Sequence, residues 1–568
     1  MHISSKIFKQ TGYFLQEIAR SKIVLQAVLV GLIAGALVVL FKVSIDSIFS
    51  HIQAFCSGLT AIQRYIIFPL ITTAGGLISG LLVFKIAPET KGSGIPYVKM
   101  TMARMGNLTR IRSIFVKFFA GIAGIGSGLS LGREGPSVQL GAGAGALVGK
   151  IFNMKGTDKD KLIASGAGAA IGATFNAPIA GTVFVLEELV QKFSPALLFP
   201  VLVATVTAAS VARHYLGSNP SFKLPYVTGG ELSLNIILAC VILGITAGIL
   251  GVIFSKVIFK FNDIFSKINV QNWAKPAIAG LITGITGLFI PWVLSSGNIS
   301  VDLLLQHKFA LSTVAIIFLT KFFITPLCFG SGAAGGIFLP MLMLGSFLGY
   351  GIGAVFCKLG VDVNPIVIAM IGMGAFLSAV ARTPITAVVM VFEMTGGYHH
   401  ILPIMLSAAI ADLVAEKMNH RPIYASLIVN QAQSEEAKLL SRLYVKDVMA
   451  RNVVTLNTDS TIKQAENALS EYGHGAYPII NSKNKLAGII TKSDIEDALF
   501  QGIPESTTID KIMNPAPVTI TPQNNLYIAY YRLHSNDTEW LVVIDRNNKI
   551  KGIITRLDIN NAFHKEFS

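Results

Sequence analysis

The stretch GSGLSLGREGPSVQLGAGAG, residues 126–145, places Arg133 and Glu134 side by side within a long apolar segment. A charged side chain that faced lipid at the centre of a bilayer would cost several kcal/mol, ~3 or more. The pair is therefore expected to face protein, water or an ion. The glycines and Pro136 around it indicate an interrupted helix rather than a continuous one.

The composition around this stretch is that of a polytopic membrane protein. The chain has 568 residues, of which 52% are hydrophobic and 14% charged, whereas soluble domains carry about 25% charge. Most of the apolar runs are long enough to cross a bilayer. They lie at 23–41, 65–85, 111–131, 162–186, 196–212, 234–258, 276–294, 309–329, 336–357, 365–393 and 401–416. Residues 1–22 are polar and basic, so the first run is interpreted as a retained helix and not a cleaved signal peptide.

The net charge of +15 resides in the membrane part, because acidic and basic residues nearly balance from Ser434 onward. Such an excess is typical of loops on the cytoplasmic side of a membrane, so no nucleic-acid partner is expected. The four cysteines lie in or beside apolar runs without the spacing of metal ligands. Neither a metal site nor a disulfide framework is predicted.

The composition changes near residue 430, and the tail beyond it contains a repeat. KLAGIITKSDIEDAL at 485–499 matches KIKGIITRLDINNAF at 549–563. Each copy predicts the order helix, strand, helix, strand, strand, helix. This part resembles a tandem pair of CBS domains, with modules at 444–500 and 507–563.

The membrane part repeats as well, which explains the glycines of the opening stretch. Aligning Gly126 with Gly330 brings GREGP at 132–136 onto GIFLP at 336–340 and KFF at 117–119 onto KFF at 321–323. Farther along, FNAPIAGTVFVLEEL at 175–189 resembles ARTPITAVVMVFEMT at 381–395, with Glu187 on Glu393. Two repeat-related halves, about 23–216 and 234–430, are predicted, and an odd number of crossings between the copies would invert them. Glycine- and proline-interrupted segments at matching positions indicate a transporter's binding site.

GREGP and GIFLP each predict a loop that runs into a helix N-terminus at membrane depth, since proline suits the first turn of a helix. Such a terminus carries unpaired N–H groups and about half a positive charge, so it can bind an anion without a lysine. A glycine-rich packing junction is the alternative. GSGIP at 92–96 adds Ser93 at a third interrupted helix end, where it could donate to an anion or simply cap the helix. RPIYASL places Tyr424 on an expected final helix, where it could point inward or lie at the interface.

These motifs, in this order and spacing, resemble the CLC family of chloride channels and chloride/proton exchangers over nearly all of 20–430. The resemblance implies that the hydroxyls of Ser93 and Tyr424, with the backbone amides of Ile337 and Phe338, hold a central chloride. It also implies an outer anion site formed by the backbone around Arg133 and Gly135. Glu134 matches the gating glutamate of the family, whose carboxylate competes with chloride for an anion site.

Glu188, in FVLEEL, matches the position that supplies protons from the cytoplasmic side in exchangers of the family. Glu187 is expected to be its structural neighbour. One departure concerns Tyr97-Val98-Lys99 after GSGIP, where family members often carry acidic residues. This departure changes the charge near the inner proton entrance.

In the tail, Thr491, Asp494, Thr555 and Asp558 occupy positions where CBS domains commonly bind a ribose. A Thr-x-x-Asp sequence also caps a helix, so adenine-nucleotide binding and simple capping both remain open.

We therefore predict an all-α polytopic membrane domain at 23–430 with two repeat-related, inverted halves and broken helices. A cytoplasmic segment at 1–22 precedes it, and a linker at 431–443 and a small α/β tandem CBS region at 444–568 follow. The predicted function is chloride/proton exchange by a homodimer in the bacterial inner membrane, with both termini cytoplasmic and no required cofactor; it is not an enzyme. A passive anion channel of the same fold is the alternative. A CBS-bearing metalloprotease would need His-Glu-x-x-His, which is missing from the sequence, and a magnesium channel would favour an acidic pore.

Overall fold

The computed structural model describes residues 2–102, 108–191, 193–222, 233–306, 309–428, 439–535, 538–545 and 547–567. The chain divides into two compact units, residues 1–428 and 429–568. The unit boundary lies two residues from the predicted end of the membrane domain at 430. Each unit is described by itself.

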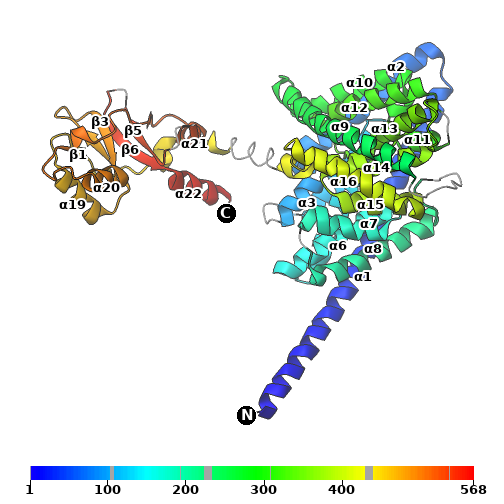
Figure 1. The fold of residues 1–568 in the computed structure, drawn as a ribbon, viewed down its shortest axis with the longest axis horizontal. Coiled ribbons are helices and arrows are strands. Elements are labelled where there is room, and N and C mark those ends of the chain that lie inside the picture. The colour runs from blue at the N-terminus through cyan, green and yellow to red at the C-terminus, as the bar shows by residue number, and fades with distance from the viewer. Residues whose placement is uncertain are drawn as a thin grey trace. The chain divides into compact units, whose positions relative to one another are not determined.

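All the named secondary-structure elements in the described part of the first unit are helices (Figure 1). The helices of the first half are α1 (His2–Ser57), α2 (Ala61–Leu81), α3 (Ile95–Met102), α4 (Ile111–Gly126), α5 (Glu134–Ile151), α6 (Gly156–Phe175), α7 (Pro178–Phe184) and α8 (Pro195–Leu216). A π-helical segment, η1 (Leu82–Ile86), extends α2, and another, η3 (Val185–Val190), extends α7. A short helix, η2 (Pro88–Thr90), precedes α3.

The helices of the second half are α9 (Leu234–Lys267), α10 (Lys275–Phe289), α11 (Asn298–Leu305), α12 (Leu311–Gly330), α13 (Phe338–Lys358), α14 (Pro365–Ala381), α15 (Pro384–Thr395) and α16 (Ile401–Lys417), followed by a helix at 423–428. Short 3-10 turns are η4 (Asn272–Ala274), η5 (Pro291–Val293) and η6 (Tyr398–His400). The helix at 423–428 contains Tyr424, which confirms the helix predicted at this position.

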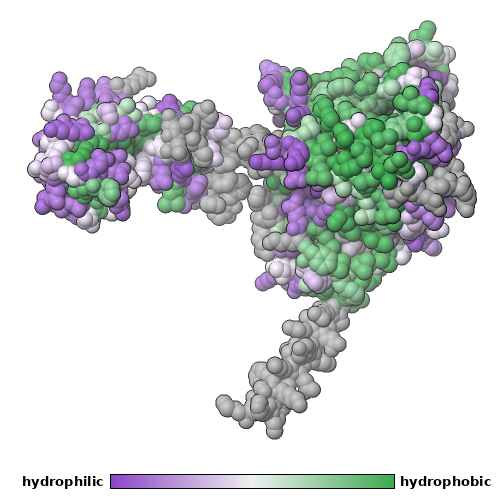
Figure 2. Space-filling model, viewed as in Figure 1, coloured by the Kyte–Doolittle hydropathy of each residue, from purple (hydrophilic) through white to green (hydrophobic). Residues whose placement is uncertain are grey.

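Seven helices in the described part of the chain are long and apolar enough to cross a membrane, the first from Lys22 to Ser57. On the face in view, hydrophobic residues form a broad band over this unit, and hydrophilic residues gather at its two flanks (Figure 2). A surface of this kind is what a bilayer requires of a protein that it surrounds. The prediction of a multi-pass membrane domain is confirmed.

Two of the predicted apolar runs are broken rather than continuous. The run at 162–186 divides where Asn176 adopts φ 56° and ends α6, after which Pro178 begins α7. Its repeat mate at 365–393 divides in the same way, at Arg382 with φ 61° and then Pro384. A left-handed residue followed by proline stops a helix even where the hydropathy continues.

The two halves meet at their matching motifs. Gly132 N donates to Gly336 O at 2.7 Å, and Gly336 N donates to Gly132 O at 2.6 Å. These two residues are repeat mates and form an antiparallel bridge. The chain therefore runs in opposite directions through the two copies at this point, as inverted repeats predict.

The same relation recurs where helices cross. Gly141 of α5 lies so close to α6 that a Cβ there would be 2.2 Å from Gly166 O. Its mate Gly345 of α13 approaches α14 equally, with a Cβ 2.2 Å from Gly372 O. Both helix pairs need glycine at the crossing, because a side chain there would clash with a backbone oxygen of the neighbouring helix.

The second unit contains two copies of one α/β module. The first has α18 (Val445–Val448), β1 (Leu456–Asn457), α19 (Ile462–Tyr472), β2 (Ala476–Ile480), β3 (Leu486–Thr491) and α20 (Lys492–Phe500). The second has η7 (Ile509–Lys511), β4 (Thr519–Ile520), α21 (Leu526–Ser535), β5 (Trp540–Ile544), β6 (Ile550–Thr555) and α22 (Arg556–Phe567). Each sheet has the order β1-β2-β3 or β4-β5-β6, with one parallel and one antiparallel pair. The predicted order of elements is confirmed in both copies.

Candidate functional site

The three interrupted helix ends lie together inside the first unit. Gly335 N, just before α13, donates to Gly92 O, just before α3, at 3.1 Å. Ser93 lies against the start of α5, since a Cβ on Gly135 would be 2.2 Å from Ser93 Oγ. The structure therefore brings the beginnings of α3, α5 and α13 to one place, as the motifs predict.

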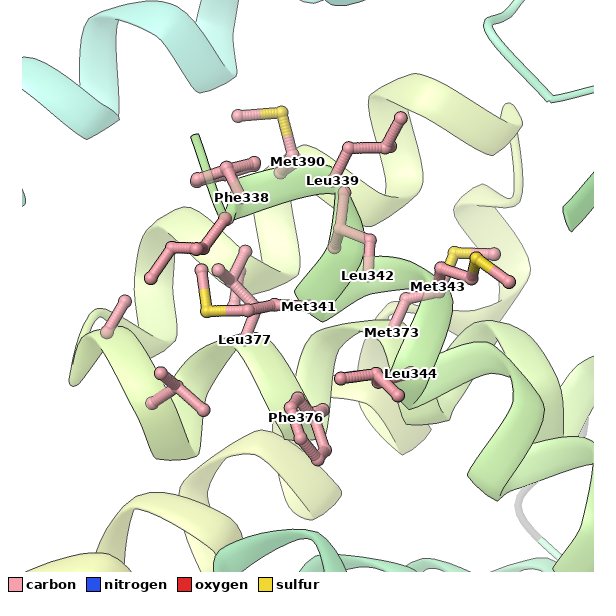
Figure 3. Close-up of a cluster of buried hydrophobic side chains, with 14 of the residues drawn as sticks. Phe338, Leu339, Met341, Leu342, Met343, Leu344, Met373, Phe376, Leu377 and Met390 are labelled. Carbon is pink, nitrogen blue, oxygen red and sulfur yellow. The ribbon is translucent and has the colours of Figure 1, made fainter. Parts of the chain in front are cut away.

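The beginning of α13 is enclosed by protein. Every residue from Phe338 to Phe347 is buried, and the side chains of α13 pack among those of α14, including Met373, Phe376 and Leu377 (Figure 3). The Phe338 ring also contacts the rings of Phe175 and Phe184, with centroids 5.7 and 6.2 Å apart. First-turn amides have no acceptor within their own helix, so this enclosed terminus offers donors to a ligand.

Two buried hydroxyls that the motifs predict for the site have no hydrogen-bond partner among the described residues. They are Ser93 Oγ and Tyr424 Oη, and these residues are 2% and 0% exposed. An unsatisfied buried polar group costs about 1–3 kcal/mol. A hydroxyl can donate to an anion, so the pair fits a ligand that accepts hydrogen bonds in a dehydrated site.

The Glu134 carboxylate occupies a position suited to an anion. It is fully buried at the start of α5, and Leu339 N of α13 donates to its Oε2 at 3.4 Å. Its Oε1 has no partner among the described residues. The carboxylate of one repeat thus lies on the helix N-terminus of the other, where the helix dipole favours negative charge.

The Arg133 side chain forms an ion pair with α1. Its guanidinium donates to both carboxylate oxygens of Asp46 on α1, at 2.7 and 2.8 Å. Arg133 is 4% exposed, whereas the Asp46 side chain is 55% exposed. The Arg133 side chain is thus engaged with α1. The backbone role of Arg133 in an outer anion site stays a prediction.

Two buried lysines were not singled out from the sequence. Lys117 Nζ donates to Thr90 O and Gly92 O at 2.8 and 2.6 Å. Its repeat mate Lys321 donates to Val293 O and Ser295 O at 3.0 and 2.9 Å. Both lysines are 0% exposed. The KFF match at 117–119 and 321–323 could have identified these lysines from the sequence, since a lysine repeated inside an apolar helix needs internal hydrogen-bond acceptors.

Glu188 forms a buried ion pair. Lys99 Nζ of α3 lies 2.7 Å from Glu188 Oε1 in η3, and the two side chains are 9% and 2% exposed. Glu188 Oε2 is buried without a partner among the described residues. The departure noted at Lys99 in the sequence therefore acts directly on the predicted proton residue.

The neighbouring Glu187 has a different environment. Its carboxylate accepts from the backbone amides of Ile385 and Thr386 at 3.1 and 2.6 Å, at the start of α15. In the other half, Glu393 accepts from Ile179 N at 3.2 Å and from Ala180 N at 2.7 Å, at the start of α7. Each copy thus caps a helix of the other. This reciprocal capping accords with the structural role predicted for Glu187.

In the second unit, the predicted ribose positions are engaged in helix caps. Thr491 Oγ1 donates to Asp494 Oδ2 at 2.8 Å, and Asp494 N donates back to Thr491 Oγ1 at 3.2 Å. Thr555 and Asp558 repeat this arrangement at 2.7 and 3.2 Å. Capping, one of the two alternatives, explains these pairs by itself; nucleotide binding stays a prediction.

Inverted repeats that bring broken helices together around unpaired buried donors define a membrane transport protein of the interrupted-helix type. Residues 75–416 match the family described as voltage gated chloride channel, and residues 445–501 and 509–565 match the CBS domain. The chain belongs to the voltage gated chloride channel family and carries two CBS domains.

The chain is similar over most of its length to named proteins. It is 34% identical over 434 residues to the H(+)/Cl(-) exchange transporter ClcA of Yersinia pseudotuberculosis, covering 73% of this chain and 89% of that protein. The protein of the same name from Vibrio cholerae is 37% identical over 371 residues, covering 63% and 78%.

Solved structures give the same fold. A slow cyanobacterial Cl-/H+ antiporter matches with a TM-score of 0.68 and 30% identity, over 72% of this chain and 97% of that one. A eukaryotic CLC transporter matches 95% of this chain and 98% of its own, with a TM-score of 0.62. At 18% identity this second likeness supports the fold alone.

Proposed function

We propose that this protein is a secondary active transporter that exchanges chloride for protons. The observation that carries the proposal is the pair of orphaned buried hydroxyls, Ser93 Oγ and Tyr424 Oη, together with the Glu134 carboxylate on the start of α13. The relatives named as chloride/proton exchangers support the same reaction.

In this proposal a dehydrated chloride is held at the centre by the hydroxyls of Ser93 and Tyr424 and by the amides of Ile337 and Phe338. Backbone donors around Arg133 and Gly135 form an outer site. No side-chain cation is needed at either place, because helix N-termini supply the positive potential. Weak, multiple donors also let the ion leave, which rapid transport requires.

Glu134 gates this path. As a carboxylate it competes with chloride for the amides at the start of α13, where Leu339 N already donates to it. As a neutral acid it loses the attraction of the helix terminus, so its side chain can leave the site to chloride. Proton and chloride then occupy the site by turns, and Glu188 passes protons between Glu134 and the cytoplasm.

The exchange proposal is tested by the reversal potential of currents from protein reconstituted in planar bilayers. We expect a fixed chloride gradient to give a reversal potential that moves when a pH gradient is added, because protons travel with chloride. A reversal potential that follows chloride alone, at every pH gradient, would make the protein a passive anion channel.

The setting proposed for this transporter is the bacterial inner membrane, with both termini in the cytoplasm and two subunits per assembly. Each subunit would have its own anion path. The basic excess of the membrane part and the bacterial relatives support this placement.

For the CBS pair we propose an adenine nucleotide as ligand, held near Thr491, Asp494, Thr555 and Asp558. We expect the full-length protein to release or absorb heat on titration with ATP, ADP or AMP. The Asp494→Ala, Asp558→Ala double variant should lose this heat. Unchanged heat in the double variant would place the ligand elsewhere, and no heat in either protein at millimolar nucleotide would exclude it.

A further inference from the structure

The Lys99–Glu188 pair connects the predicted anion site with the predicted proton-transfer residue. Lys99 lies on α3, the helix that begins just after Ser93, and Glu188 lies in η3. The 2.7 Å contact therefore links the element beside the orphaned Ser93 hydroxyl to the acid on the proton route. With both side chains nearly inaccessible to solvent, water screens this attraction far less than that of a surface pair.

Few other charges face Glu188. Glu187 is adjacent in the chain, but its carboxylate is held by the start of α15. The Tyr424 phenol is within electrostatic range of both Glu188 and Glu134. Among the described residues, Glu188 forms an ion pair only with Lys99. Lys99 is thus the cation that pairs with this acid.

The two oxygens of Glu188 are not equivalent. Oε1 accepts from Lys99, whereas Oε2 is buried without a partner among the described residues. A buried carboxylate that accepts one strong bond and leaves one oxygen open can take a proton on the open oxygen. Protonation there neutralises the acid and weakens its hold on Lys99.

We propose that Lys99 is a positioning residue for the proton leg of transport: it favours the ionised form of Glu188 against the effect of burial, leaves Oε2 as the proton acceptor, and thereby sets the cytoplasmic pH at which protons enter. This inference rests on the proposed exchange function. Without Lys99, Glu188 would stay protonated to higher pH, because no nearby positive charge would favour the carboxylate. Lys99 does not itself contact the transported chloride in this scheme.

The test is Lys99→Gln, with proton uptake driven by a chloride gradient and recorded against cytoplasmic-side pH in vesicles of defined orientation. We expect the midpoint of this pH profile to rise by about 1–3 pH units, the usual effect of removing an opposite charge at this distance. Lys99→Glu should shift it further in the same direction, and Lys99→Arg should keep the wild-type midpoint.

A matched control is Lys161→Gln. Lys161 and Asp158 form an ion pair of the same 2.7 Å length, but their side chains are 24% and 45% exposed. Its loss should leave the pH midpoint unchanged. A merely structural role for Lys99 would lower all fluxes of Lys99→Gln in proportion and would not move the midpoint, and that result would overturn the inference.

An infrared pH titration separates this inference from the exchange proposal. The carboxyl band of Glu188 is identified by its loss in Glu188→Gln, and its titration does not require transport. We expect the band to persist to higher pH in Lys99→Gln than in the wild-type protein. Equal titration in the two proteins would overturn the inference, even if the wild-type protein exchanges protons. A shifted band in a protein that moves no protons would refute only the exchange proposal.

Discussion

Glu134→Ala should reduce chloride-driven proton movement to the level of protein-free vesicles while chloride still passes. The helix termini and the hydroxyls of Ser93 and Tyr424 remain, so the anion path survives. The residue that competes with chloride and carries the proton is gone. Chloride flux should therefore become nearly independent of external pH, whereas flux limited by one protonation changes about tenfold per pH unit on its alkaline side.

The measurement pairs a chloride electrode with a pH electrode on the same vesicle suspension. Glu134→Gln is the matched variant, because it keeps the side-chain shape without a titratable group, and it should also move no protons. Proton uptake in Glu134→Ala that equals the wild-type value would show that Glu134 is not the gate.

Glu188→Ala should also stop proton movement and leave chloride flux, but with a different pH dependence. Glu134 is still present on the start of α13, so it continues to block the anion path until it is protonated. Chloride flux should therefore remain stimulated by external acid in Glu188→Ala and not in Glu134→Ala. Flux recorded over a series of external pH values distinguishes the two variants.

Glu187→Gln is the control for Glu188→Ala. Its amide oxygen can still accept at the start of α15, where the carboxylate now accepts from Ile385 N and Thr386 N. Proton movement should persist in this variant. If Glu188→Ala still pumps protons against their gradient, Glu188 is not the inner relay, and Glu187 or a water path must replace it.

Much of the fold could be predicted because glycine and proline recur at matching positions of the two repeats. Gly132 and Gly336 align in the sequence and exchange hydrogen bonds in the structure. Gly141 and Gly345 align and each permit a helix crossing. Positions at which no side chain fits keep the same spacing in both copies, so aligning the copies predicts where the helices break.

The breaks within the other apolar runs could not be predicted from hydropathy. Asn176 and Arg382 end α6 and α14 in a left-handed conformation, yet the residues on either side are equally apolar. Pro178 and Pro384 were visible in the alignment, but a proline can also lie within a membrane-spanning helix, as Pro326 does in α12. Only the packed structure decides between a kink and a stop.

The ion-pair partners of the charged residues could not be predicted from the sequence either. Asp46 pairs with Arg133 from a helix 87 positions earlier, and Lys99 reaches Glu188 across 89 positions. Pairing at such separations depends on how helices pack, which hydrophobic spacing does not specify. The residue types at the site were predictable from motifs, whereas the charges that tune them were not.

In the proposed mechanism, chloride and the Glu134 carboxylate compete for the same helix terminus. Crystals grown in bromide test this competition, since anomalous scattering locates this chloride substitute. We predict a bromide peak beside Ser93 Oγ and Tyr424 Oη in the wild-type protein. In Glu134→Gln, a second peak should appear near Leu339 N, where the carboxylate lies in the present structure. Identical bromide peaks in both proteins, or none near these hydroxyls, would show that chloride and this carboxylate do not compete for the terminus.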